Sequence, residues 1–326
     1  MSFPIERPRR LRRTTALRAM LADTCLRPSD LIQPLFVREN AAEPRPITSM
    51  PRLMHHTRDS LRKAAAQAAE AGVGGIMIFG IPAVTDPTGH RAWDPDGIAQ
   101  LALSDVADEV GDALVVIGDV NLDEYTDHGH VGLLGADGDV DNDATLQAYA
   151  HVAVAQADAG AHMVAPSGMM DGQVAAIRAA LDEAGHPQMP ILAHAATYAS
   201  AFYGPFRDAA ESRLADDRST HQQDPAGSAS EAWREVALDI AEGADLVMVK
   251  PAGHYLDIIR QIADRVQVPV AAYQTSGEYA AIEAAAERGW LPRERAITES
   301  LTAIRRAGAS RVVTYWAVEI AERLRR

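Results

Sequence analysis

The segment Asp245-Leu246-Val247-Met248-Val249-Lys250-Pro251 indicates the fold class of this chain. An unbroken apolar run leads into Lys250 and Pro251 ends it, as in a buried parallel strand with an amine at its carboxyl end. Burial of an ammonium group is costly, so the site favours the neutral amine, which can attack a carbonyl to form a Schiff base. The alternative is a lysine that extends its ammonium group to water at the sheet edge. The strand alone does not separate these two interpretations.

Composition narrows the class of protein. The chain has 326 residues, is 47% hydrophobic and carries a formal net charge of -14, which argues against nucleic acid as a partner. Its one cysteine, Cys25, excludes a disulfide framework or a thiolate zinc cage within one chain. No apolar run approaches the length of a membrane span, and Met1-Ser2-Phe3-Pro4 lacks the apolar core of a secretory signal. We expect a cytoplasmic protein without a membrane partner.

The first two dozen residues are rich in arginine. Such a cluster occurs in transit peptides, in phosphate-binding patches and in arms that dock on an acidic neighbour. Because the rest of the chain is net negative, we favour an arm over residues 1–28 that contacts another subunit, followed by a catalytic domain over residues 29–326. The arginines are Arg7, Arg9, Arg10, Arg12, Arg13 and Arg18.

Strand-like and helix-like segments then alternate along the chain. We predict strands over 31–37, 75–79, 114–120, 162–165, 191–196, 245–250, 268–273 and 311–315. We predict helices over 59–71, 96–110, 144–159, 172–184, 230–242, 255–265 and 293–307. Glycines close or follow several of these helices. Eight strands alternating with helices predict an α/β fold of the (β/α)8 TIM barrel type. The rival doubly wound sheet lacks its Gly-x-Gly-x-x-Gly turn after the first strand.

Two connections, 119–143 and 197–230, are longer than a structural loop needs, and both follow strands on the side where barrels place their chemistry. We interpret them as lids. Two arginines in the second loop, Arg207 and Arg218, indicate an anionic substrate, because a guanidinium group matches a carboxylate. On the same face the strands deliver Asp119, Ser167, Thr197, Lys250, Ser276 and Tyr315.

Several segments together carry a resemblance to a known family. They are Arg7-Pro8-Arg9-Arg10-Leu11-Arg12-Arg13, Ala165-Pro166-Ser167, Tyr198-Ala199-Ser200-Ala201-Phe202-Tyr203-Gly204-Pro205-Phe206-Arg207-Asp208-Ala209-Ala210, Met248-Val249-Lys250-Pro251 and Ser276-Gly277-Glu278. Over nearly its whole length the chain resembles the porphobilinogen synthase (δ-aminolevulinic acid dehydratase) family. The resemblance implies an eight-stranded barrel, an N-terminal arm wrapped around a neighbouring subunit and a homo-octamer or other homo-oligomer.

The resemblance also implies roles for individual residues. Lys250 would hold the first 5-aminolevulinate as a Schiff base, with Asp119 as a further catalytic candidate. Ser276 and Tyr315 would bind the carboxylate of that first molecule. The carboxylate of the second would be bound by Arg207, Arg218 and Gln222.

The chain departs from the family pattern at several of these positions. Thr197 replaces a second Schiff-base lysine, and a hydroxyl group cannot form an imine. Gly168 stands where the family has an aspartate. The cysteine positions that hold zinc in one branch of the family are Asn121, Asp123 and Val131 here, so zinc is not expected there. Asp123 is a weak candidate ligand for Mg²⁺, and we expect no required cofactor.

The resulting expectation is a lyase that binds 5-aminolevulinate on Lys250 and condenses it with loss of water, as in tetrapyrrole and heme biosynthesis. One alternative is a divergent single-lysine homologue that makes another product from 5-aminolevulinate or a related 4-oxo acid in specialised metabolism. A second alternative is a non-catalytic assembly partner, because Thr197 and Gly168 both remove reactive side chains.

Overall fold

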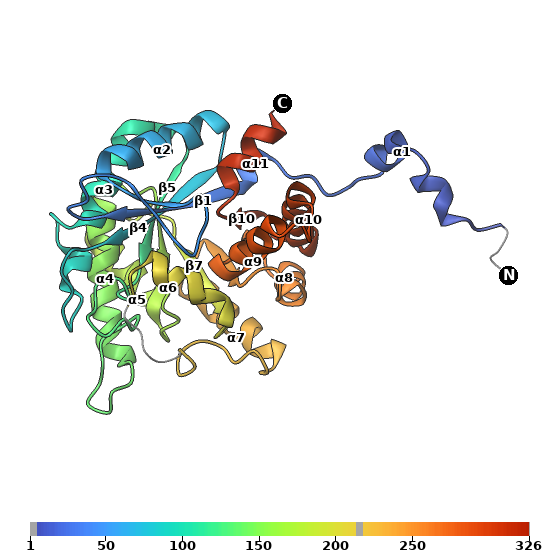
Figure 1. Cartoon of the computed structure of the whole chain (residues 1–326). Helices are drawn as coiled ribbons and strands as arrows, with labels where there is room; N and C mark the ends of the chain where they lie inside the picture. The colour runs from blue at the N-terminus through green and yellow to red at the C-terminus, as the bar shows by residue number, and fades with distance from the viewer. Residues whose placement is uncertain (1–4, 213–217, 326) are drawn as a thin grey trace.

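A computed structural model describes residues 5–212 and 218–325. All eight predicted strands form, and each pairs in parallel with its neighbours in cyclic order (Figure 1). They are β1 (Leu31–Arg38), β4 (Gly75–Ile81), β5 (Val115–Val120), β6 (Met163–Pro166), β7 (Leu192–Thr197), β8 (Leu246–Lys250), β9 (Val270–Tyr273) and β10 (Arg311–Val313). A single bridge between Val164 and Ile191 joins β6 to β7 and closes the ring. The predicted (β/α)8 barrel is therefore confirmed.

The strands are buried along almost their whole length, which explains their continuous apolar sequence. Helices surround them, and all seven predicted helices are present within a few residues of their predicted ends. The helices after the arm are α2 (Arg58–Ala71), α3 (Ile98–Val110), α4 (Asn142–Asp158), α5 (Gln173–Glu183), α6 (Gly204–Ala209), α7 (Ala229–Glu242), α8 (Leu256–Ala263), α9 (Ser276–Glu287), α10 (Arg293–Ala307) and α11 (Ala317–Leu324).

Helix α9 was not predicted, although the sequence carries a start signal for it. Thr275 and Glu278 form a capping box, in which each side chain accepts a hydrogen bond from the backbone of the other residue. The helix therefore begins at Ser276, at the end of β9. This placement matters for the site because the first N–H groups of a helix have no partner within the helix and favour an anion.

Short elements complete the described chain. Two short strands that the sequence did not indicate, β2 (Arg45–Pro46) and β3 (Met54–His56), extend the sheet beside β1. The 3-10 turns are η1 (Pro8–Arg12), η2 (Pro28–Asp30), η3 (His90–Trp93), η4 (Gly111–Ala113) and η5 (Ala201–Tyr203). No helix among the described residues is long and apolar enough to cross a membrane.

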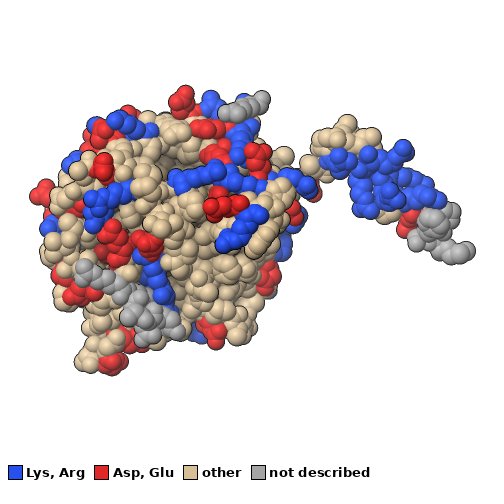
Figure 2. Space-filling model, viewed as in Figure 1, with Lys and Arg blue, Asp and Glu red and all other residues tan. Residues whose placement is uncertain are grey.

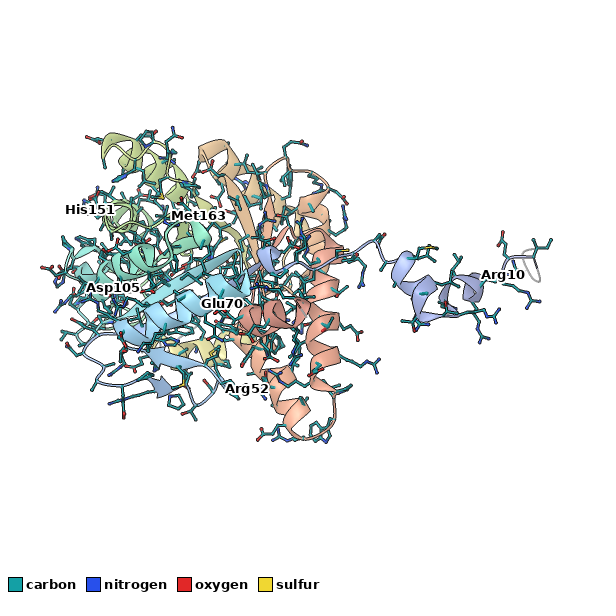
Figure 3. All side chains as sticks on the ribbon, turned by 90° about the horizontal axis from the view of Figure 1, so that it is seen from above. Arg10, Arg52, Glu70, Asp105, His151 and Met163 are labelled. Atoms are coloured by element: carbon teal, nitrogen blue, oxygen red, sulfur yellow. The ribbon has the colours of Figure 1, made fainter. Side chains whose placement is uncertain are left out.

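The N-terminal segment stands apart from the barrel. Turn η1 and helix α1 (Thr15–Met20) have no buried residue, and the chain carries them away from the body of the molecule (Figure 1). Basic side chains cover much of this segment, whereas basic and acidic side chains are interspersed on the visible face of the barrel (Figure 2). From above, Arg10 lies far outside the barrel, while Glu70, Asp105 and His151 mark its outer helices (Figure 3). A subunit contact for residues 1–28 stays a prediction, and residues 1–4 lie outside the described part of the chain.

Candidate active site

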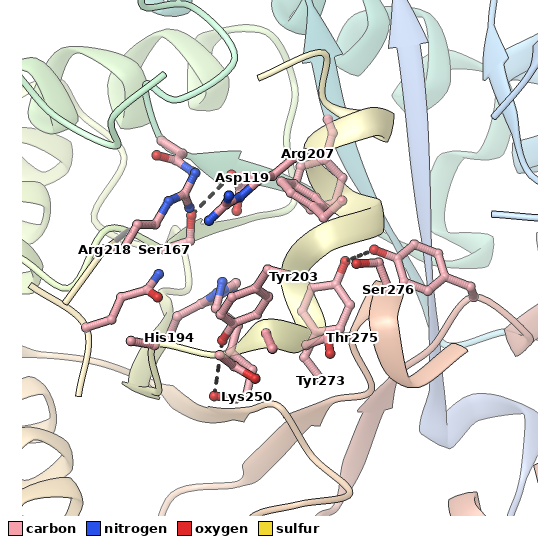
Figure 4. Close-up of a pocket in the computed structure, with 18 of the residues that line it drawn as sticks. Asp119, Ser167, His194, Tyr203, Arg207, Arg218, Lys250, Tyr273, Thr275 and Ser276 are labelled. Carbon is pink, nitrogen blue, oxygen red and sulfur yellow. Dashed lines mark hydrogen bonds between the residues drawn. The ribbon is translucent and has the colours of Figure 1, made fainter. Parts of the chain in front are cut away.

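A cavity of about 310 Å³ opens at the carboxyl ends of the strands (Figure 4). This is the end of the barrel at which such folds place their chemistry. The cavity walls come from strands, from the loop after β7 and from the start of α9. The predicted site residues that line it are Asp119, Ser167, Arg207, Arg218, Gln222, Lys250, Ser276 and Tyr315.

Lys250 is the last residue of β8 and extends into this cavity (Figure 4). The pKa of the Lys250 amine is lowered to about 8: burial is the main cause, the charge of Asp119 opposes it, and the charge of Arg218 adds to the lowering. The Nζ atom lies 5.8 Å from the ring centroid of Tyr203 and 6.0 Å from that of Tyr273. Within the described chain no carboxylate forms an ion pair with Lys250, so the neutral amine is accessible at moderate pH.

The sequence contains only one other lysine, Lys63. Lys63 lies on α2, its side chain is 77% exposed, and it pairs with Asp59 at 2.7 Å. Lys250 is therefore the only lysine of the chain that can act as a nucleophile in the cavity.

Asp119 lies near the end of β5, is buried and lines the cavity. Its Oδ2 atom accepts a hydrogen bond of 3.2 Å from Ser167, and Oδ1 has no partner within the described chain. Burial raises the pKa of Asp119 to about 7, because a carboxylate loses its hydration there, although the charge of Lys250 opposes the rise. A carboxyl group with this pKa can both accept and release a proton near neutral pH.

Arg218 is fixed by an ion pair with Asp123, whose side chain is fully buried. Asn121 donates a hydrogen bond of 2.7 Å to the other oxygen of the Asp123 carboxylate. Burial alone would lower the pKa of Arg218, but the charge and hydrogen bond of Asp123, together with the charge of Glu124, outweigh burial and raise that pKa. The guanidinium group stays charged beside the cavity.

The same residues test whether a metal fits. Asn121 donates a hydrogen bond to Asp123, Asp123 pairs with Arg218, and Val131 is a fully buried apolar residue, so these three positions do not fit a thiolate zinc site. Within the described chain no cluster of three metal-ligating side chains is present. Asp123 was also a candidate ligand for Mg²⁺, but its carboxylate is already engaged in the ion pair with Arg218.

The other predicted anion-binding groups also line the cavity. Arg207 belongs to α6 and is exposed, and Gln222 follows Arg218 in the second long loop. Residues 213–217 of that loop lie outside the described chain. Across the cavity, Ser276 begins α9, and the Tyr315 hydroxyl lies 3.0 Å from that of Tyr273. The cavity thus has cationic groups on one wall and neutral hydrogen-bond donors on the other.

Thr197 is not brought to the cavity surface. It pairs in register with Lys250, so both side chains leave the sheet on the same side. However, Thr197 is fully buried and its hydroxyl donates to the carbonyl of His194 at 3.3 Å. His194 itself lines the cavity, and sequence reasoning missed it. A histidine inside an apolar strand was the only local signal.

The structure explains why position 168 holds a glycine. A Cβ atom at this position would overlap the phenol hydroxyl group of Tyr149. Tyr149 is fully buried on α4 and donates a hydrogen bond of 2.8 Å to the carbonyl of Val131. The phenol group fills the space in which an aspartate side chain would start, so the two positions have to be considered together.

Comparison with known proteins agrees with this geometry. The family model described as delta-aminolevulinic acid dehydratase matches residues 5–323. A delta-aminolevulinic acid dehydratase of Streptomyces coelicolor is 61% identical over 99% of this chain and 98% of the relative. One of Mycobacterium tuberculosis is 58% identical over 98% of each chain.

A solved structure gives the same result. The Toxoplasma gondii delta-aminolevulinic acid dehydratase (porphobilinogen synthase), crystallised with its reaction product porphobilinogen, superposes with a TM-score of 0.94 at 39% identity. The match covers 97% of this chain and 91% of that one. A match this complete, together with a half-buried strand-end lysine in the cavity, leads to one conclusion: this chain belongs to the delta-aminolevulinic acid dehydratase family.

Proposed function

We propose that the chain condenses two molecules of 5-aminolevulinate to porphobilinogen with loss of water, and that Lys250 holds one of them as an imine. Family membership makes the chain a lyase of tetrapyrrole biosynthesis. The observation that carries the finer proposal is the setting of Lys250. Its amine has a pKa of about 8, and it lies in the cavity with no carboxylate paired to it among the described residues.

The two walls of the cavity suit two acids. One keto acid bound to Lys250 would direct its carboxylate to the start of α9, where Ser276 supplies a hydroxyl group at the helix N-terminus, and to Tyr315. The second acid would place its carboxylate between Arg207 and Arg218, with Gln222 beside them. Asp119, with its pKa near 7, is positioned to exchange protons with the Lys250 imine.

A pyrrole assay tests this function. Purified protein is incubated with 5-aminolevulinate and the products are followed by colour and by mass spectrometry. We expect porphobilinogen from the parent chain and none from Lys250→Met. The matched control is Lys63→Arg, which changes the only other lysine and should leave the rate unchanged.

Thr197 supports one competing function. With one lysine in the cavity, only one keto acid can be activated as an imine, which would suit a single-imine enzyme with another product. Relatives named delta-aminolevulinic acid dehydratase match over the full chain, which favours the pyrrole. A Lys250 adduct accompanied by a product of different mass would decide for the competing function. A non-catalytic partner is disfavoured because the cavity keeps its lysine and both arginines.

We propose further that residues 1–28 contact a second copy of this chain. The segment is basic, exposed and separate from a body that makes the chain net negative. Light scattering of the full chain and of a variant lacking residues 1–28 would show a smaller assembly for the truncated protein. We also propose that activity survives a chelator, because the positions of the family's zinc ligands do not fit a metal here.

A further inference from the structure

His194 is a buried polar group without a partner. Its side chain is 1% exposed, and neither ring nitrogen has a hydrogen-bond partner within the described chain. A neutral imidazole carries one N–H donor and one acceptor nitrogen. Because nearly all buried polar groups in folded proteins are hydrogen-bonded, both unmet positions require an explanation. A ligand that enters the cavity would provide one.

The imidazole of His194 faces the cavity that such a ligand would enter. His194 lines the same cavity as Lys250, and Figure 4 shows both side chains on one side of it. Residues three apart in a regular strand point to opposite faces of a sheet. Here the pairing of β7 with β8 shifts register between Ala193 and Ala196. This irregularity explains how His194 and Thr197 both face the barrel interior.

The charge state of the ring is also defined. Burial lowers the pKa of His194 well below its ordinary value, and the nearby charge of Lys250 lowers it further. The imidazole is therefore neutral in the free enzyme. A neutral imidazole can donate a hydrogen bond to a carbonyl oxygen without requiring a counter-charge, a role that histidine has in another barrel enzyme.

We propose that His194 donates a hydrogen bond to the ketone oxygen of the second keto acid, the one that Thr197 cannot hold as an imine. This inference rests on the proposed function, because it presumes that Lys250 holds the first keto acid. The hydrogen bond draws electron density from the carbonyl carbon. It therefore makes that carbon more reactive toward an amine and the neighbouring C–H group more acidic. His194 partly replaces covalent activation with polarisation.

The test separates the second site from the first. Lys250 is first blocked by borohydride reduction of its imine with unlabelled levulinate, a 4-oxo acid. 5-Aminolevulinate labelled with ¹³C at its ketone carbon is then bound to the blocked enzyme, and its ¹³C resonance is recorded. The same experiment is run on His194→Phe, which keeps a planar ring without an N–H group, and on His194→Gln, which keeps an N–H donor.

We expect the ketone resonance to move downfield from its position in the free acid in the parent and in His194→Gln. It should stay near the free position in His194→Phe. In turnover, His194→Phe should lose about 10²–10³-fold in kcat, the usual effect of removing one such donor, while adduct formation at Lys250 stays within about twofold. A histidine with only a packing role would not move the resonance of the bound ketone.

The outcomes are distinguishable. If parent and His194→Phe give the same ketone resonance, or the same rate of pyrrole formation, His194 does not bind the second ketone. If no adduct forms at Lys250 in the parent, the proposed function itself fails. The matched control is His162→Gln, because His162 lies just before β6 at the opposite end of the barrel and accepts from the Val116 N–H at 3.3 Å. It should leave the resonance unchanged, and thermal unfolding of every variant shows whether it folds.

Discussion

The pKa of Lys250 can be measured through the imine that it forms. An ordinary lysine has a pKa of 10.5, whereas burial and Arg218 lower that of Lys250 to about 8. At pH 7 the neutral fraction of the amine is then about 10% instead of about 0.03%, roughly 300 times more nucleophile. Below its pKa the amine is mostly protonated and cannot attack a ketone, so trapping should rise about tenfold per pH unit and level off above pH 8.

The assay is borohydride trapping of a saturating 4-oxo acid over a pH series, quantified by mass spectrometry of the peptide that contains Lys250. Because the chain has only two lysines, the exposed Lys63 serves as an internal reference in the same sample. We expect half-maximal trapping at Lys250 near pH 8.

The variant Asp119→Asn tests in which direction the Asp119 charge moves the pKa of Lys250. The charge of Asp119 opposes the lowered pKa of Lys250, so Asp119→Asn should move the midpoint to lower pH. A midpoint near 10.5 in the parent, or a shift to higher pH in Asp119→Asn, would refute the argument that a dry and positively charged setting keeps this amine neutral.

Four further substitutions probe the surroundings of the site. Asp123→Ala leaves the buried guanidinium group of Arg218 without its counter-charge. Urea unfolding should therefore show a loss of about 3–5 kcal/mol in stability. An unchanged unfolding midpoint would contradict the ion pair between these two residues. Gly168→Asp forces a side chain into the phenol group of Tyr149, so unfolding should show a loss of about 1–3 kcal/mol or more. Adding Tyr149→Ala should then cost less than the sum of the two single changes. Thr197→Lys places a second amine in register with Lys250. Borohydride should then trap two acids per chain, and pyrrole formation should rise roughly tenfold or more. A single adduct would show that the new amine does not reach the cavity.

The fold could be predicted from sequence because its signals are local. The apolar strands and the amphipathic helices with glycine stops are short-range patterns, and every strand and helix predicted from them formed. Helix α9 was missed even though Thr275 and Glu278 form a capping box that could have been recognised. Strands β2 and β3 carried no local signal, since they depend on the part of β1 that extends beyond its pairing with β10.

The sequence also determined which strand ends would carry chemistry. In a parallel barrel all carboxyl ends meet at one face, so Lys250, Asp119 and Tyr315 had to lie near each other once the barrel was predicted. The pKa of Lys250 was foreseen in direction for the same reason, because an amine at the tip of a buried strand loses its hydration.

Only the tertiary structure decided which side chains meet. The register shift in β7 lets His194 line the cavity, whereas Thr197 is fully buried and is not among the lining residues. Sequence spacing alone places the two side chains on opposite faces. In the same way, Tyr149 fills the space beside Gly168 from a different helix. Hydrophobic periodicity depends on residues that are close in the sequence, and it determines which segments form helices and strands. Contacts between elements depend on register and packing over long sequence separations, which no local pattern encodes.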